Sequence, residues 1–203
     1  GDTLHSAFTK TESNFTELYS VLGGISITFI TQESDFPVQD ATTITLEAQT
    51  VYLLSSAITT AKKFTVNDGA VLTALNILSP TLTYTGTGSM FTGVDASFTI
   101  REIKIDHPNA QGFSFTDTIG GQYLFLNEKV RTISGLKYGT FNDMQSVLIE
   151  GSSAISLNDG ITVSGTNCVL WSVDKFFIGS SSASFIGFDM GSGISQTIEF
   201  SDF

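Results

Sequence analysis

Acidic side chains are the groups of this chain that could do chemistry, and they are scattered along the sequence. Two carboxylates about 5–5.5 Å apart make a retaining glycosidase and a wider pair an inverting one, so polysaccharide hydrolysis is the reaction to consider. The candidates are Glu102, Asp106, Asp117, Glu128, Asp143, Glu150, Asp159, Asp174, Asp189 and Glu199. No Asp-x-Asp or paired-Asp signature marks such a pair. We therefore expect most of them at turns, where Asp bonds its own backbone, and we expect no catalytic residue.

A polysaccharide lyase would instead need an acidic calcium site with an Arg or Lys base beside it. Arg101 and Arg131 are the only arginines, and the one carboxylate adjoining either of them is Glu102. An EF-hand loop is absent from the sequence. His5 and His107 are isolated and Cys168 is the single cysteine, which disfavours zinc. The sequence predicts no metal site and no cofactor, with His107 a turn residue in Asp-His-Pro-Asn.

Four aromatic residues offer one alternative, because an exposed aromatic strip could stack on sugar rings. They are Tyr123, Trp171, Phe176 and Phe177. Aromatic residues in apolar strand runs more often belong to the core, and we favour that interpretation.

Charge and composition exclude several classes of protein. The net charge is −11 over 203 residues, and nine basic residues are spread along the chain, so nucleic acid and anionic membranes are poor partners. No run approaches the ~20 apolar residues of a membrane span. The length suits one sizeable domain, or a small module followed by a larger one.

The N-terminal segment, from Gly1 to Gly24, has the spacing of an amphipathic helix. A seam interrupted once by threonine repeats in steps of four and three, at Leu4, Phe8, Thr11, Phe15, Leu18 and Leu22. We expect residues 1–24 to form a short α-helix, with Leu4, Phe8, Phe15, Leu18 and Leu22 as its oligomerisation seam. Packing between chains is the favoured interpretation, and a helix lying on this chain's own β-domain is the alternative.

From Ile25 onward, short β-branched and apolar runs alternate with Gly, Ser, Thr, Asn and Asp, which is typical of strands and turns. The stretch Thr31–Ala41 is interpreted as an irregular loop. A rough repeat is visible in glycine-led segments, which recur at Gly88, Gly112, Gly139, Gly160 and Gly187. Longer apolar segments lie between them, at Phe98–Ile105, Tyr123–Leu126, Val147–Ile149, Val169–Trp171 and Thr197–Phe200.

This repeat favours a β-solenoid over a β-sandwich. A period of roughly 20–30 residues with two or three strands matches one coil of a β-solenoid. We predict a mainly β protein, with a right-handed parallel β-helix over residues 25–203 after the N-terminal helix. A β-sandwich, which also has many short strands, is the structural alternative.

The opening segment carries a resemblance to a known family. Phage virion proteins often begin with GDTL, then A-F-x-K, then N-F-x-E-L-Y. The matching residues here are Gly1, Asp2, Thr3, Leu4, Ala7, Phe8, Lys10, Asn14, Phe15, Glu17, Leu18 and Tyr19. Tyr84–Asp106 is similar to coils of phage proteins with a pectate-lyase-like β-helix.

The resemblance implies a structural component of a bacteriophage particle, such as a tail fibre or spike, on the virion surface. Its implied partners are two further copies of itself, in a homotrimer, and other virion proteins. One alternative is a tailspike that binds or degrades host polysaccharide, and another is a capsid decoration or head fibre. We expect the true start of the chain to be missing or to have been processed, and more chain to follow Phe203.

Overall fold

The computed structural model describes residues 25–74, 80–120, 122–165, 170–180 and 182–191, and the backbone of 198–201. The predicted N-terminal helix, its seam of Leu4, Phe8, Phe15, Leu18 and Leu22, and Cys168 lie outside these residues.

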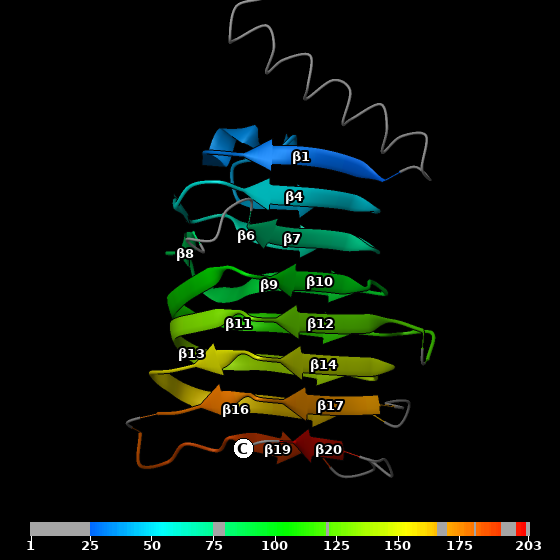
Figure 1. Ribbon diagram of the computed structural model, residues 1–203, viewed down its shortest axis with the longest axis vertical. Coiled ribbons are helices and arrows are strands. Elements are labelled where there is room, and N and C mark those ends of the chain that lie inside the picture. The colour runs from blue at the N-terminus through cyan, green and yellow to red at the C-terminus, as the bar shows by residue number, and fades with distance from the viewer. Residues whose placement is uncertain are drawn as a thin grey trace, which may run out of the picture.

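One parallel sheet, here called sheet A, forms the face toward the viewer in Figure 1. Every neighbouring pair in it runs parallel. In spatial order its strands are β1 (Ser26–Ile30), β4 (Thr50–Leu54), β7 (Ala70–Ala74), β10 (Phe98–Arg101), β12 (Leu124–Glu128), β14 (Ser146–Glu150), β17 (Leu170–Asp174) and β20 (Ile198–Ser201). Spatial order follows chain order, with other strands between successive members.

Those other strands form sheet B, and its pairs are also parallel except for β2 with β3. They are β2 (Val38–Gln39), β3 (Thr43–Leu46), β5 (Ile58–Thr60), β6 (Lys63–Val66), β8 (Thr81–Tyr84), β9 (Gly88–Val94), β11 (Lys104–Thr116), β13 (Arg131–Asn142), β15 (Ser153–Ala154), β16 (Leu157–Ser164), β18 (Phe177–Ile178) and β19 (Phe188–Met190). A short 3-10 helix, η1, spans Glu33–Asp35.

The chain is therefore a parallel β-solenoid in which each coil crosses both sheets. Val51 pairs with Val71 on the next coil, and Ala70 pairs with Phe98, so the second of these coils is the longer. The parallel solenoid is confirmed, and the β-sandwich alternative is wrong because its antiparallel pairing occurs in the described strands only at β2–β3. Right-handed winding, which nearly all parallel crossovers adopt, stays a prediction.

The two families of repeated segments occupy different sheets. The long apolar segments supply β10, β12, β14, β17 and β20 of sheet A, and the glycine-led segments supply β9, β11, β13, β16 and β19 of sheet B. The last residues of four glycine-led segments form a register row, Phe115–Phe141–Val163–Met190. The first segment departs from this row, because its last residue, Phe91, pairs with Phe113 rather than with Phe115, and Gly88 pairs with Ala110.

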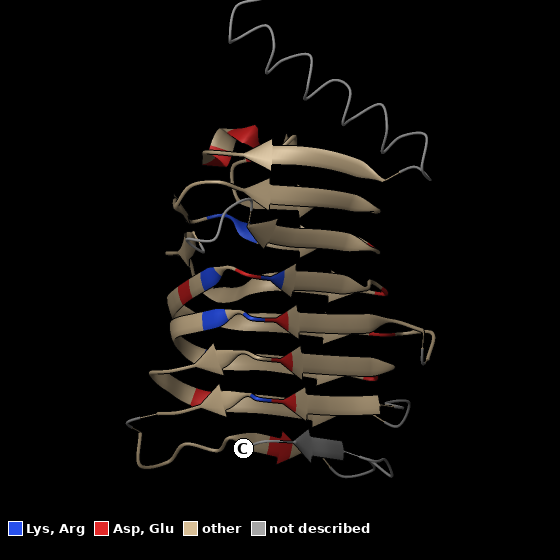
Figure 2. Cartoon of the chain, viewed as in Figure 1, with Lys and Arg blue, Asp and Glu red and all other residues tan. Residues whose placement is uncertain are grey.

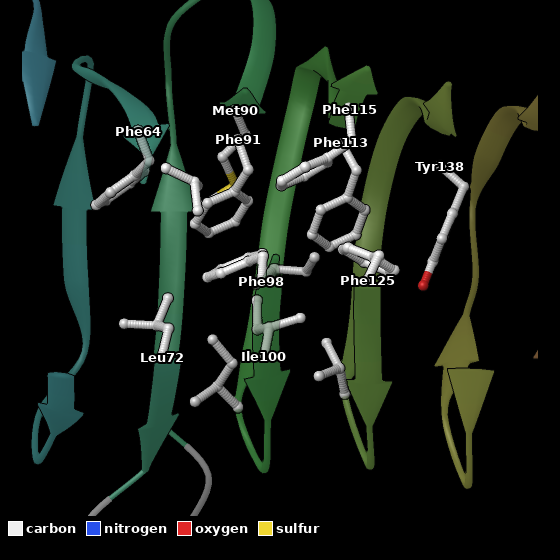
Figure 3. Packing of buried hydrophobic residues seen from close by; sticks show 14 of the residues in the cluster. Phe64, Leu72, Met90, Phe91, Phe98, Ile100, Phe113, Phe115, Phe125 and Tyr138 are labelled. Carbon is white, nitrogen blue, oxygen red and sulfur yellow. The ribbon is translucent and has the colours of Figure 1, made fainter. Parts of the chain in front are cut away.

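Aromatic side chains from both sheets fill the space between them (Figure 3). Phe91 lies between Phe64 and Phe113, with ring centroids 5.0 and 5.5 Å away. Phe125 links the rings of Phe113 and Phe141, at 4.9 and 4.8 Å. Inward residues thus stack from coil to coil, which confirms the ladders expected from the sequence.

The predicted loop over Thr31–Ala41 is wrong in part, because η1 and β2 lie within it. Phe36 follows η1 and is 1% exposed, with its ring 5.8 Å from that of Tyr52 and 5.4 Å from that of Phe64. Asp35 accepts hydrogen bonds from the Thr31 hydroxyl and backbone N–H, which lower its pKa to about 2. The segment therefore places an aromatic ring over one end of the core.

Candidate functional site

Charged side chains gather where the central strands of sheet A end, and we call this set the charged edge (Figure 2). The last residues of β10, β12, β14 and β17 are in register with one another and form one row. The residues that directly follow β10, β12 and β17 add further charges beside this row. The charged edge consists of Arg101, Glu128, Glu150 and Asp174, followed by Glu102, Lys129 and Lys175. It brings together four of the ten candidate carboxylates that look unrelated in the sequence.

The corner after each strand has a repeated backbone geometry. Glu102, Lys129 and Lys175 have φ of 58°, 52° and 49°, and Gly151 has 56° at the equivalent place. The Lys129 N–H donates to the Glu150 carbonyl at 2.8 Å, and the Gly151 N–H to the Asp174 carbonyl at 2.9 Å. The Glu102 N–H donates to the Glu128 carbonyl in the same way, so the corners after β10, β12 and β14 are each fixed by a hydrogen bond to the next coil. Three of these left-handed positions hold a charged residue instead of the Gly or Asn that such geometry favours.

The charged edge makes solvated ion pairs. Lys129 Nζ lies 3.3 Å from Glu128 Oε1 and 3.7 Å from Glu102 Oε1, and Lys175 Nζ lies 3.9 Å from Asp174 Oδ2. The side chains of Lys129 and Glu102 are 62% and 51% exposed, so each such pair contributes only about 0–1 kcal/mol to stability.

Two pairs of carboxylates in the charged edge have a placement that suits a catalytic pair, Glu128 with Glu150 and Glu150 with Asp174. The members of each pair are in register on neighbouring strands, so their backbones are about 4.8 Å apart. A general acid also needs surroundings that raise its pKa, usually an apolar pocket. Glu150 is exposed, and Glu128 lies beside Lys129. This row is where paired-carboxylate chemistry should be sought.

Three other candidate carboxylates form hydrogen bonds or an ion pair with nearby residues. Asp117 is buried and accepts N–H groups of Ile119, Gly120 and Gln122 at 3.0, 2.8 and 2.9 Å, which confirms the turn role expected for it. Asp106 accepts from the Ser134 hydroxyl, and Asp159 pairs with Lys137 at 3.7 Å.

The general expectation that these carboxylates sit at turns is wrong for several of them. The strands themselves contain Asp106, Glu128, Glu150, Asp159, Asp174 and Asp189. The side chain of Glu199 lies outside the described residues.

Sheet B presents a second regular surface, which we call the hydroxyl row. One outward position holds a hydroxyl in six successive strands: Thr45, Thr65, Thr92, Ser114, Thr140 and Thr162. Thr162 accepts from Lys137 Nζ at 2.6 Å, and the Thr140 hydroxyl donates to Gln111 at 3.3 Å.

Within the described residues, no group of three or more His, Cys, Asp or Glu could hold a metal ion.

The aromatic residues considered for sugar stacking divide between core and surface. Trp171 and Phe176 are buried, which confirms the core interpretation for both. Phe177 is 63% exposed, and Tyr123 packs half-buried against the core. The sugar-stacking strip is therefore reduced to one exposed ring among these residues.

His107 is not a turn residue, and this prediction is wrong. It lies inside β11 and is fully buried, where the pairing with β13 shifts register on either side of it. Its Nδ1 lies 3.0 Å from the Ala110 carbonyl, and its buried Nε2 has no hydrogen-bond partner. Pro108 is part of β11 only because this irregularity accommodates it, which the tetrapeptide alone does not indicate.

The pH dependence of stability should report this burial. Desolvation lowers the pKa of His107, although the Ala110 carbonyl and the charge of Asp106 oppose the shift. The unfolded chain therefore binds more protons, and stability should fall as the pH drops below about 6.5, by at most about 1.4 kcal/mol per pH unit. Urea midpoints between pH 7.5 and 5.5 measure it. His107→Gln should flatten the slope and His5→Gln should not; equal slopes in both variants would refute the assignment.

The described part of the chain holds no helix with the length and apolar character of a membrane span. Comparison of the chain with protein-family models, curated proteins and solved structures finds no match.

Proposed function

We propose that this chain is a structural component of a bacteriophage particle, a rigid β-solenoid rod in a tail fibre, spike or other appendage. The observation that carries the proposal is the uninterrupted core, in which rings from Phe36 to Trp171 contact one another from coil to coil. Such a core gives a stiff body with all described strands of one sheet in register. In this proposal the chain is not an enzyme and needs no cofactor.

The phage assignment itself rests on the resemblance of residues 1–24 to virion proteins. In the proposal these residues form the helix that joins identical chains, with a homotrimer as the expected assembly. Capsid decoration is the neighbouring alternative, since the same rod would serve on a head or on a tail.

The seam makes a specific prediction. Phe15→Asp together with Leu18→Asp places two charges on the predicted interhelical contact, so the native oligomer should fall to monomers in light scattering. Ser13→Asp with Thr16→Asp adds the same two charges on the side of the predicted helix away from the seam, so it is the matched control and should keep the native mass. A seam variant that also keeps the native mass would remove the seam from the proposal.

The location of the chain in an intact particle tests the proposal as a whole. Gold-labelled antibody against the purified chain should decorate one appendage of the phage in electron micrographs, with a fixed number of copies per particle. Decoration of the tail or of the head separates the two structural alternatives. A chain found only in the soluble fraction of lysed cells, with bare particles, would overturn the proposal.

A host-polysaccharide spike is the second candidate function. The in-register Glu128 and Glu150 favour it, since neighbouring carboxylates could serve hydrolysis, and the hydroxyl row could bind sugar. Incubation of the chain with bacterial surface polysaccharide should then shorten the polymer. Glu128→Gln with Glu150→Gln should abolish shortening but leave the fold intact. Polymer that neither binds nor shortens would dismiss this candidate.

A further inference from the structure

The outer side of sheet A carries an apolar column that leaves its side chains half-exposed. One outward register position, followed over seven strands, holds Ile27, Val51, Val71, Thr99, Leu126, Leu148 and Ser172. Phe29 and Leu170 flank the column at its two ends, 40% and 39% exposed. We call this surface the apolar face. A sheet face that meets only water normally carries polar residues, whereas five of the seven side chains in this column are apolar.

Charge is distributed in a way that sets the apolar face apart. The strands of sheet A are free of Lys, Arg, Asp and Glu from β1 to β17 until their last residues, where the charged edge begins (Figure 2). The outward side of sheet B instead holds the hydroxyl row and Lys63, Lys104, Asp106 and Lys137. An apolar centre depleted of charge, with a charged rim, is the composition of a protein interface.

We propose that the apolar face is a lateral interface to a second copy of this chain. Outward side chains repeat here at the rung spacing of about 4.8 Å, and a second copy of this solenoid repeats its own side chains at the same spacing over the same length. The distribution of charge favours this face over the others for self-association. Two chains of net charge −11 repel each other, and this uncharged surface is where their approach costs least.

The size of the apolar face is sufficient for such a contact. Seven strands about 4.8 Å apart and five residues long give roughly 30 by 16 Å, so two copies together cover roughly 1,000 Å², the lower limit for a specific interface. The contact is additional to the N-terminal seam. It goes beyond the proposed function, because lateral pairing of two solenoids does not require a phage particle.

Sedimentation equilibrium of the full chain tests the proposal. The wild type should associate, and Leu126→Asp with Leu148→Asp should weaken association at least about 100-fold, because two apolar side chains are lost from each copy and replaced by charges. The matched control is Thr140→Asp with Thr162→Asp. It adds the same two charges at neighbouring in-register positions on sheet B, and it should associate like the wild type.

Each outcome decides the proposal. Circular dichroism melts establish that the variants fold, and Leu126→Ser with Leu148→Ser, expected to weaken association in the same direction, replaces the Asp pair if that pair unfolds. A monomeric wild type, or equal association of the apolar-face variant and its control, would overturn the inference. Association that is lost in Phe15→Asp with Leu18→Asp but unchanged in the apolar-face variant would also overturn the inference and leave the seam standing. Labelling of particles judges the phage assignment separately.

Discussion

Phe125→Ala should destabilise the chain by about 3–5 kcal/mol, the usual cost of deleting a buried ring. Phe125 is fully buried and contacts more rings than any other side chain of the described core. Its ring lies within 6.3 Å of those of Phe98, Phe113, Phe115 and Phe141, which lie on the three strands β10, β11 and β13. A cavity at this point would remove the ring that links Phe113 to Phe141. The surrounding coils cannot close the cavity without shifting register. Urea unfolding measures the loss.

Phe177→Ala is the matched control, because it makes the same chemical change at a ring that is 63% exposed. Its effect should stay within about 0.5 kcal/mol. Similar losses from Phe125→Ala and Phe177→Ala would mean that the ring of Phe125 does not occupy the centre of a packed core.

Gly135→Ala should be the most damaging single-methyl addition among the tested positions, at about 1–3 kcal/mol or more. A Cβ at Gly135 would lie 2.1 Å from Cε1 and 2.3 Å from Nδ1 of His107. His107 cannot retreat easily, because it is fully buried and Gly112 approaches its other side, where a Cβ would lie 2.9 Å from Nε2. Thermal and urea unfolding of the purified variant measure the cost.

Two further variants isolate this contact. Gly187→Ala is the control, since its Cβ would meet no described atom closer than 3.7 Å, and it should be nearly neutral. In the double variant Gly135→Ala with His107→Ala, the new methyl fills part of the space left by the imidazole, so the combined loss should be smaller than the sum of the single losses. Additive losses would contradict direct packing of His107 on Gly135.

The fold was predictable from the sequence because every coil needs one segment for each of the two sheets, so two types of segment recur along the chain. Long apolar segments such as Val147–Ile149 lie in one sheet and glycine-led segments such as Gly160–Val163 in the other, and the parallel solenoid that their repeat predicts is confirmed. Segment spacing gives coil length only approximately. The offset of Gly88, which pairs with Ala110 and not with Gly112, arises from where β9 and β11 begin relative to their turns, which no single segment encodes.

The charged edge was not predictable from the sequence, because it depends on the register between strands. Glu128, Glu150 and Asp174 become neighbours only once the register of β12, β14 and β17 is known, and an error of one residue would place them on the opposite side of the sheet. In hindsight one signal was present: each carboxylate ends an apolar segment. Burial of His107 had no such signal, since Asp-His-Pro-Asn is typical of a turn and its place in β11 depends on the space provided by Gly135.

The seam of Leu4, Phe8, Phe15, Leu18 and Leu22 stays a prediction, as do the homotrimer and the virion location. The apolar face adds a surface that the repeat pattern alone does not single out. Outward Leu126 and Leu148 belong to the same apolar runs as the inward Phe125 and Val147. Only the alternation of buried and half-buried positions in β12 and β14 separates the core from the surface.

Oxidative cross-linking tests the stacked register on which the whole account depends. Thr140 and Thr162 are in register on β13 and β16, so Thr140→Cys with Thr162→Cys, in a Cys168→Ser background, should close an intramolecular disulfide. Thr140→Cys with Ser164→Cys is displaced along the strand to the next position on the same face, and its Cα separation of about 8 Å exceeds the span of a disulfide. The account predicts rapid closure for the first pair and none for the second. Closure of the displaced pair alone, or of neither pair, would contradict it.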